Sequence, residues 1–170
     1  MYKLELRNRK SIRLKQYDYS SQGMYFITIC VKNRECILSK INCKQGVGVD
    51  DHVDPIKLQT CGKIVQEKIK NINYAYENVM VNQYVIMPNH IHMLIEIKEK
   101  DRKNGSMRAS TPTIPQIVNA LKGLITKQIG FSIFQRNYYE HIVRNEKEYL
   151  KIQEYIKNNP LNWEEDELNM

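Results

Sequence analysis

The chain has few of the residues that mark disulfide-rich, zinc-binding or membrane proteins. Only four of its 170 residues are cysteines, and no two form a Cys-x-x-Cys pair, which argues against a zinc ribbon or a thiol redox motif. We interpret them as reduced thiols. No apolar run is long enough to cross a bilayer, and the first residues lack a secretory hydrophobic segment. We therefore expect a cytoplasmic protein without a membrane partner.

Acidic residues are in the minority. Lys and Arg total 26 against 19 Asp and Glu, for a net charge of +7. This balance favours a polyanionic partner such as nucleic acid, although a basic surface also serves solubility alone. The length suits one domain over 1–170. Within it we expect a basic N-terminal arm (1–20), a mobile basic loop (98–112) and an acidic tail (164–170).

Hydrophobic periodicity and turn residues divide the chain into strands and helices. The expected elements are strand 24–31, helix 56–73, strands 79–87 and 90–97, a helix between 113 and 130, strand 138–143 and a helix from 145 to about 158. Asp54 is expected to cap the first helix, with Pro55 in its first turn. The order β-α-β-β-α-β plus a C-terminal helix predicts an α+β, ferredoxin-like fold. Its antiparallel sheet carries two helices on one face.

The most informative segment is Pro88-Asn89-His90-Ile91-His92. Because alternate residues of a strand share a face, His90 and His92 are expected to point the same way, and Ile91 the opposite way. Two imidazoles one strand step apart can hold one divalent ion. The alternative is a pair of histidines that are solvated or satisfied within the core.

The C-terminal helix carries a second pair of polar groups. Tyr155 and Asn159 are four residues apart and therefore lie on one flank of the helix, where they can face the histidines. The amide oxygen of Asn159 is a suitable ligand for Mg²⁺ or Mn²⁺ beside two imidazole nitrogens. Tyr138 and Tyr139 are rival candidates for a tyrosine nucleophile, and His141 has no assigned role.

Four segments, in this order, resemble the single-tyrosine HUH transposases, and within them the REP-associated tyrosine transposases. The segments are residues 10–20, 84–92, 134–145 and 154–160. Together they span most of the chain, from about Lys10 to Trp163. The His-hydrophobic-His signature alone is a weak signal, whereas the four segments in order are specific.

The resemblance implies a metal-dependent enzyme of DNA transposition. It would nick and rejoin single-stranded hairpin DNA of repetitive extragenic palindromes through a 5′-phosphotyrosine intermediate. By this match Tyr155 is the nucleophile, while His90, His92 and Asn159 hold Mg²⁺ or Mn²⁺. Relatives in the wider group exchange the tyrosine helix within a dimer, whereas the REP-associated branch is expected to act as monomers, so a homodimer stays open.

Basic residues of the N-terminal arm are candidate contacts to DNA phosphates or base edges, with a merely solvated arm as the alternative. They are Arg7, Arg9, Lys10, Arg13 and Lys15. Two other functions stay open. One is a ferredoxin-like nucleic-acid-binding module without cleavage activity, although the chain lacks a clear RNP1 pattern. The other is a zinc hydrolase, which would need a third His or carboxylate ligand.

Overall fold

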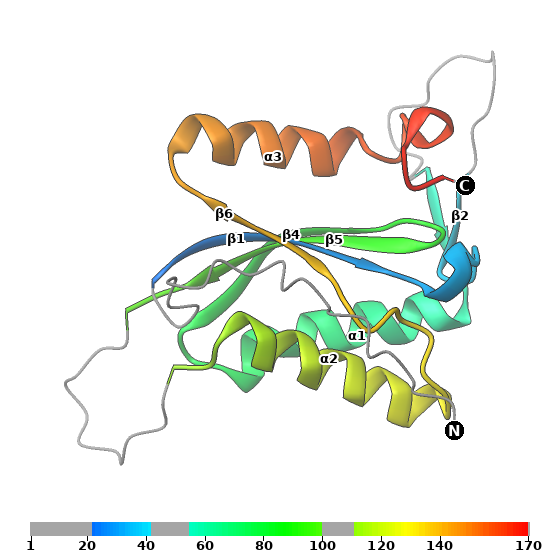
Figure 1. The fold of residues 1–170 in the computed structure, drawn as a ribbon, viewed down its shortest axis with the longest axis horizontal. Coiled ribbons are helices and arrows are strands. Elements are labelled where there is room, and N and C mark those ends of the chain that lie inside the picture. The colour runs from blue at the N-terminus through cyan, green and yellow to red at the C-terminus, as the bar shows by residue number, and fades with distance from the viewer. Residues whose placement is uncertain (1–21, 42–54, 100–110, 170) are drawn as a thin grey trace, which may run out of the picture.

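A four-stranded antiparallel sheet forms the centre of the protein. The computed structural model describes residues 22–41, 55–99 and 111–169. The strand order is β4-β5-β1-β6, with bounds Val79–Ile86, His90–Ile97, Gly23–Cys30 and Tyr139–Val143. Helices α1 (Thr60–Ala75) and α2 (Ile114–Ile129) lie on one face and α3 (Glu146–Asn158) on the other (Figure 1). The predicted α+β architecture, with an antiparallel sheet and a C-terminal helix, is confirmed.

The first helix begins later than predicted. Residues Ile56–Leu58 form strand β3, which pairs antiparallel with β2 (Ser39–Ile41), and α1 starts only at Thr60. The expectation of a helix over 56–73 is therefore wrong at its start, and Asp54 lies outside the described residues. The apolar-charged-apolar sequence of Ile56–Leu58 has the strand period. Its partner lies in a segment that local periodicity does not identify.

The expected starts of the other two helices are confirmed, and each helix has a cap at that position. Thr113 and Gln116 form a reciprocal capping box at the start of α2, and Gly130 ends that helix with φ of 93°, in the left-handed region. Asn145 caps α3 by accepting a hydrogen bond from the Glu148 backbone N–H at 2.9 Å. The Asn145 cap marks where α3, the helix bearing Tyr155, begins.

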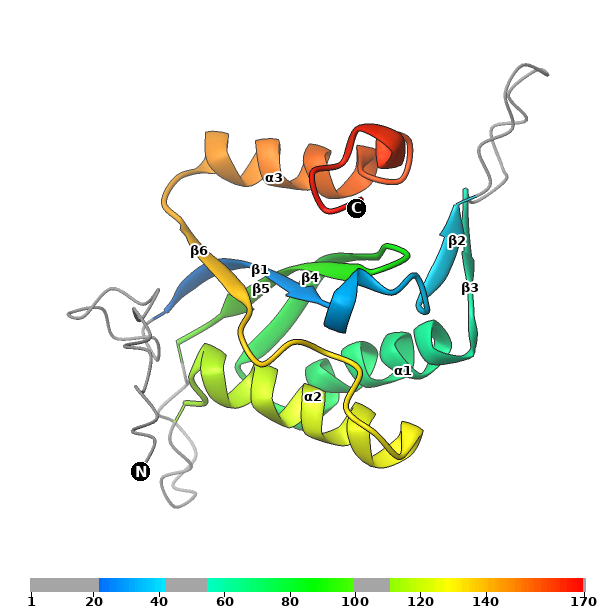
Figure 2. The ribbon, with the colours of Figure 1, turned by 45° about the vertical axis from the view of Figure 1, so that its right-hand side comes forward.

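Two apolar clusters lie on opposite faces of the sheet. The larger one packs β1, β4 and β5 against α1 and α2. The smaller one packs Val85, Met87 and Leu94 of the other face against Ile156 of α3, which is 1% exposed. Tyr149 and Ile152 join this cluster, so α3 buries the side of the helix that carries these apolar residues. This packing sets the rotation of α3 about its own axis. Figure 2 shows from a second direction that α3 lies on the face of the sheet opposite α1 and α2.

None of the helices among the described residues is both long enough and apolar enough to span a membrane.

Candidate metal and tyrosine site

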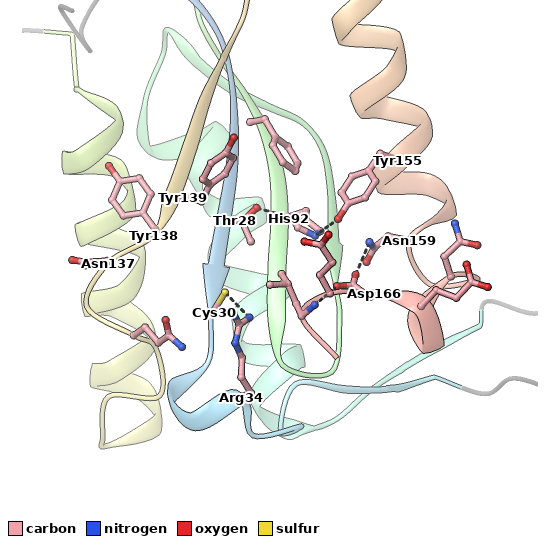
Figure 3. A pocket seen from close by; sticks show the side chains of 16 residues that line it. Thr28, Cys30, Arg34, His92, Asn137, Tyr138, Tyr139, Tyr155, Asn159 and Asp166 are labelled. Carbon is pink, nitrogen blue, oxygen red and sulfur yellow. Dashed lines mark hydrogen bonds between the residues drawn. The ribbon is translucent and has the colours of Figure 1, made fainter. Parts of the chain in front are cut away.

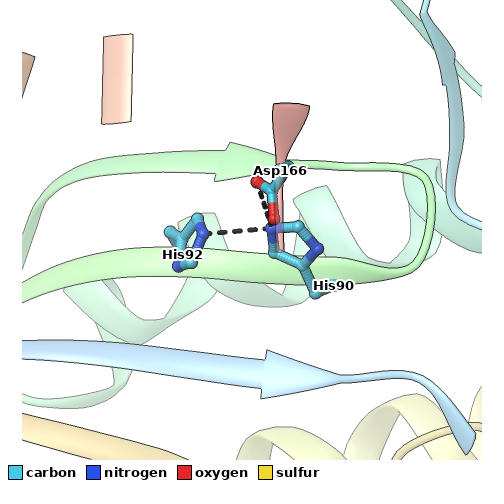
Figure 4. Close-up of side chains that lie close together, drawn as sticks. All are labelled: His90, His92 and Asp166. Atoms are coloured by element: carbon cyan, nitrogen blue, oxygen red, sulfur yellow. Dashed lines mark hydrogen bonds and ion pairs between the residues drawn. The ribbon is translucent and has the colours of Figure 1, made fainter. Parts of the chain in front are cut away.

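The two predicted histidines converge on one face of β5. Their Nε2 atoms lie 3.0 Å apart, and both side chains are buried (Figure 4). Each outer nitrogen has its own partner: His90 Nδ1 lies 2.8 Å from Asn89 Oδ1, and His92 Nδ1 lies 2.8 Å from Thr28 Oγ1. Such partners fix ring orientation in metal sites. The sheet therefore holds both rings with their Nε2 atoms directed into one space.

The protonation states follow from these partners. Asn89 Oδ1 is an acceptor, so His90 Nδ1 carries the proton and its Nε2 offers a lone pair. The Thr28 hydroxyl can accept from or donate to His92 Nδ1, so His92 can present either tautomer at Nε2. Burial lowers the pKa of both imidazoles to about 3. The charge of Arg34 also lowers the pKa of His90, and His90 in turn lowers the pKa of His92. Both rings are neutral at physiological pH, the form that ligates metals.

Tyr155 reaches the histidine pair from α3. Its phenol oxygen lies 3.3 Å from His92 Nε2, and the two ring centroids are 5.2 Å apart. The ring also meets Phe26 edge-on, with centroids 6.0 Å apart. Burial raises the pKa of the phenol, as do the nearby charges of Asp166 and Glu167, whereas the Asn159 amide opposes the shift. Tyr155 is therefore a protonated phenol at neutral pH and must lose its proton if it attacks an electrophile.

Asn159 lies one turn beyond Tyr155 and is 3% exposed. Its Nδ2 donates to Asp166 Oδ2 at 2.9 Å. Its Oδ1 is buried and has no hydrogen-bond partner among the described residues. A buried amide oxygen without a partner is unfavourable in the apo protein, and such an atom is available to a cation.

Asp166 joins the site from the turn after α3. It follows the short 3-10 helix η2 (Trp163–Glu165), and its side chain is only 4% exposed. Its Oδ2 lies 3.9 Å from His90 Nε2, while its Oδ1 accepts from the Leu168 backbone N–H at 2.7 Å. The candidate ligand atoms of His90, His92 and Asp166 all lie within 4.8 Å of one another. The C-terminal turn thus brings a carboxylate to the histidines.

Sequence reasoning missed this role of Asp166, which it placed in an acidic tail. No periodicity marks the residue, since it follows the helix-ending Pro160 in an irregular segment. Of the four acids in the run 164–167, Asp166 is the one that the structure does not leave exposed, and no local pattern in the sequence distinguishes it from the other three.

A groove of about 830 Å³ opens beside the tyrosine (Figure 3). One wall carries Tyr155 and Asn159 together with the acidic turn after α3, which contributes Glu165, Asp166 and Glu167, and the floor carries Phe26, Thr28 and His92. The far wall carries residues from the end of β1, from η1 (Lys32–Arg34), from the segment before β6 and from the first position of β6. Those residues are Cys30, Arg34, Gln135, Asn137, Tyr138 and Tyr139. This volume lies in the upper part of the range for ligand pockets, about 300–1,000 Å³.

The remaining predicted residues are placed as follows. The candidate DNA contacts Arg7, Arg9, Lys10, Arg13 and Lys15 lie outside the described residues, as do residues 100–110 of the predicted loop. The rival nucleophile Tyr138 packs its ring 5.3 Å from the Lys122 ammonium. His141 lies 2.6 Å from Glu148 Oε1, so it links β6 to the first turn of α3.

The chain matches known proteins over most of its length. Residues 19–159 match the family model described as transposase, IS200-like. An uncharacterized protein of Haemophilus influenzae is 39% identical over 183 residues, covering 98% of this chain and 96% of that protein. A second protein of this organism, provisionally named a REP-associated tyrosine transposase, is 25% identical over 153 residues, covering 85% of this chain and 73% of its own length.

A solved structure shares the fold. It is a REP-associated tyrosine transposase bound to a REP hairpin. The TM-score is 0.55 at 21% sequence identity, over 83% of this chain and 68% of the other. At this identity the likeness concerns the fold, and it agrees with the antiparallel sheet and three helices described above.

Proposed function

Since this chain belongs to the IS200-like transposase family, we propose that it nicks and rejoins single-stranded DNA with Tyr155 as the nucleophile. The observation that carries the proposal is the position of the Tyr155 phenol oxygen, 3.3 Å from His92 Nε2 and thus beside a pair of converging neutral imidazoles. The predicted family is confirmed, and the chemistry is our inference from this geometry.

The residues fit a divalent cation. His90 and His92 offer neutral nitrogen ligands, and the partnerless Oδ1 of Asn159 offers an oxygen. Imidazole and carbonyl oxygen together suit Mn²⁺ or Mg²⁺. We propose that Asn159 is the third ligand and that Asp166 holds its amide in place. A cation bound there would neutralise charge on the scissile phosphate and polarise the phosphorus.

The proposed step exchanges one phosphodiester for another. The Tyr155 oxygen bonds to phosphorus, the bond from phosphorus to the DNA 3′ oxygen breaks, and the released strand ends in a 3′ hydroxyl. The phenol gives up its proton during the attack, because its raised pKa keeps it protonated beforehand. Attack and departure are in line, so catalysis depends on holding Tyr155 and the phosphate in register. The phosphotyrosine conserves the bond, so rejoining needs no ATP.

We propose hairpin-forming single-stranded DNA as the substrate. The net charge of +7 suits a polyanion, and the solved relative is bound to a REP hairpin. The repetitive palindromic character of the substrate rests on that likeness and on the resemblance of the four sequence segments.

The test is a covalent adduct. The protein is incubated with labelled hairpin oligonucleotides and Mn²⁺ or Mg²⁺, then resolved on a denaturing gel. We expect a shifted band that is lost with EDTA and in Tyr155→Phe. Tyr149→Phe is the matched control, since Tyr149 lies on the same helix in the apolar cluster. An adduct that persists in Tyr155→Phe would overturn the assignment of the nucleophile.

We further propose that α3 acts on the histidines of its own chain, because Tyr155 and His92 already meet within one protomer. A mixture of Tyr155→Phe and His90→Ala proteins tests this. We expect no adduct from the mixture. Recovery of activity would mean that a second subunit supplies the tyrosine.

Asp166 favours one competing function. His90, His92 and Asp166 make a His₂-carboxylate set, the ligand type of several zinc hydrolases, in which a bound water is the nucleophile. Tightly held zinc, together with cleavage that survives Tyr155→Phe and leaves no adduct, would favour that function.

A further inference from the structure

The far wall of the groove carries groups that the step above does not use. We propose, as an extension of the proposed DNA-nicking function, that it binds the nucleotide on the 5′ side of the cleaved phosphate. In this subsite Arg34 binds the phosphate of that nucleotide and Tyr139 stacks on its base.

Tyr139 lies in the same cross-strand row as the catalytic face. Thr28 of β1 pairs with His92 of β5 on one side and with Tyr139 of β6 on the other. Directly paired residues of antiparallel strands present their side chains on the same face. Tyr139 therefore shares the face of the histidines, two strands away, a separation of about 10 Å.

The Tyr139 ring is available for stacking. It is 52% exposed although it lines the groove. A half-exposed aromatic ring at the start of an edge strand contributes little to the core. Aromatic rings of this kind are the platforms on which proteins stack the bases of single-stranded nucleic acids.

Arg34 brings a positive charge to the same wall. Its Nη1 donates to Cys30 Sγ at 3.0 Å, and the described residues give its guanidinium no carboxylate partner. Its charge acts on His90, so it lies within electrostatic reach of the histidine pair. Asn33 and Arg34 also have φ of 53° and 57°, a region that non-glycine residues adopt uncommonly. Strained backbone is typical of functional positions.

Lys122 keeps this wall in shape. Its ammonium donates to the backbone carbonyls of Gln135, Arg136 and Asn137 at 3.0, 3.2 and 3.3 Å. The segment leading into β6 is therefore anchored to α2. A wall anchored in this way is preorganised for a ligand, which reduces the entropy lost on binding.

In-line geometry decides which nucleotide this wall holds. The leaving 3′ oxygen must depart opposite to the attacking oxygen of Tyr155. Tyr155 approaches from the α3 wall, whereas Tyr139 lies across the floor from it and Arg34 lies beside Cys30 at the end of β1 (Figure 3). The nucleotide that ends in the leaving 3′ hydroxyl, which is the 5′ neighbour of the phosphate, is therefore directed toward Arg34 and Tyr139.

The experiment probes the base and the protein together. Hairpin oligonucleotides with a randomised single-stranded flank are incubated with the full chain and Mn²⁺, and the captured adducts are sequenced. The best substrate is then remade with an abasic site at the 5′ nucleotide. We expect the abasic site to slow adduct formation by the wild type by roughly 5- to 150-fold, the range for one stacked base. In Tyr139→Ala the abasic site should cause no further loss, and Tyr139→Phe should behave as the wild type.

Arg34 is tested with a neutral linkage. A methylphosphonate in place of the phosphate of that nucleotide should slow the wild type but not Arg34→Gln. Lys32→Ala and Tyr74→Ala are the matched controls, since both residues are exposed and neither lines the groove. Both should respond to the modified DNA as the wild type does. Affinities measured by fluorescence anisotropy in a Tyr155→Phe background repeat the comparison without cleavage.

The outcomes separate this inference from the proposed function. If the wild type forms adducts, but the abasic site slows the wild type and Tyr139→Ala by the same factor, the subsite alone is overturned. A wild type that forms no adduct with any member of the library would overturn the nicking function and the subsite with it.

Discussion

Asn159 donates its side-chain N–H to Asp166 at 2.9 Å, and its own amide oxygen stays buried without a partner among the described residues. This hydrogen bond determines the orientation of the Asn159 amide. The Asp166 carboxylate only accepts hydrogen bonds, so the amide must turn its Nδ2–H, and not its oxygen, toward Asp166. The oxygen is therefore directed away from Asp166. This relationship is the structural basis for assigning Asn159 as the oxygen ligand and Asp166 as its support.

We predict different metal affinities for variants of these two residues. Asn159→Ala removes a ligand and should abolish measurable Mn²⁺ binding in a calorimetric titration. Asp166→Ala removes only the group that orients the ligand, and should weaken binding by about 10- to 100-fold. Glu164→Gln, a charge-matched change at an exposed neighbour, should have no effect. Equal, complete loss in both alanine variants would instead make Asp166 a ligand.

The smaller apolar cluster should control the tyrosine helix. Ile156→Ala removes the buried anchor of α3 and should destabilise the protein by about 2–5 kcal/mol in urea denaturation. Adduct formation should fall as well, because α3 carries Tyr155. Leu150→Ala, at a position on the same helix that is 55% exposed, should change stability by no more than about 0.5 kcal/mol. Similar losses in both variants would contradict this account of how α3 is held.

Glu148 should make the attachment of α3 sensitive to acid. Its carboxylate accepts from the Arg144 backbone N–H at 2.7 Å and contacts His141 at 2.6 Å, and these bonds lower its pKa from the usual 4.5. Because the pKa is lower when folded, the stabilisation is full above pH 4.5 and is lost as the pH falls through the folded value. Glu148→Gln should therefore lower the melting temperature at pH 7, and the difference from the wild type should shrink below pH 4.5. A difference independent of pH would contradict this role.

Two helical glycines should respond in opposite directions to alanine. At Gly62 an added Cβ would lie 2.0 Å from the Leu38 carbonyl oxygen, so α1 would have to move away from the segment before β2. Gly62→Ala should be strongly destabilising in thermal denaturation. At Gly123 an added Cβ meets nothing within 4 Å, and Gly123→Ala should stabilise the protein by about 0.5–1 kcal/mol. A stable Gly62→Ala protein would mean that α1 and β2 are not packed as described.

Local sequence predicted the elements whose signals are contained within them. The capping box of Thr113, the stop at Gly130 and the cap at Asn145 all depend on contacts over a few residues, and each is present in the structure. The predicted start of α1 was wrong because residues Ile56–Leu58 form a strand. Its partner strand lies 17 residues earlier in the chain, as the pairing of Lys57 with Lys40 shows. A three-residue ladder carries no periodic signal strong enough to outweigh an adjacent Asp-Pro pair.

The period of a β-strand by itself placed His90 and His92 on one face, and the spacing of a helical turn placed Tyr155 and Asn159 on one flank. Both follow from backbone geometry and need no knowledge of the rest of the chain. Only the tertiary structure decided that α3 lies over those histidines, that Asp166 returns to them and that Tyr139 shares their row. Each of these depends on contacts between residues far apart in sequence, which are selected by burial of apolar surface over the whole domain rather than by any local pattern.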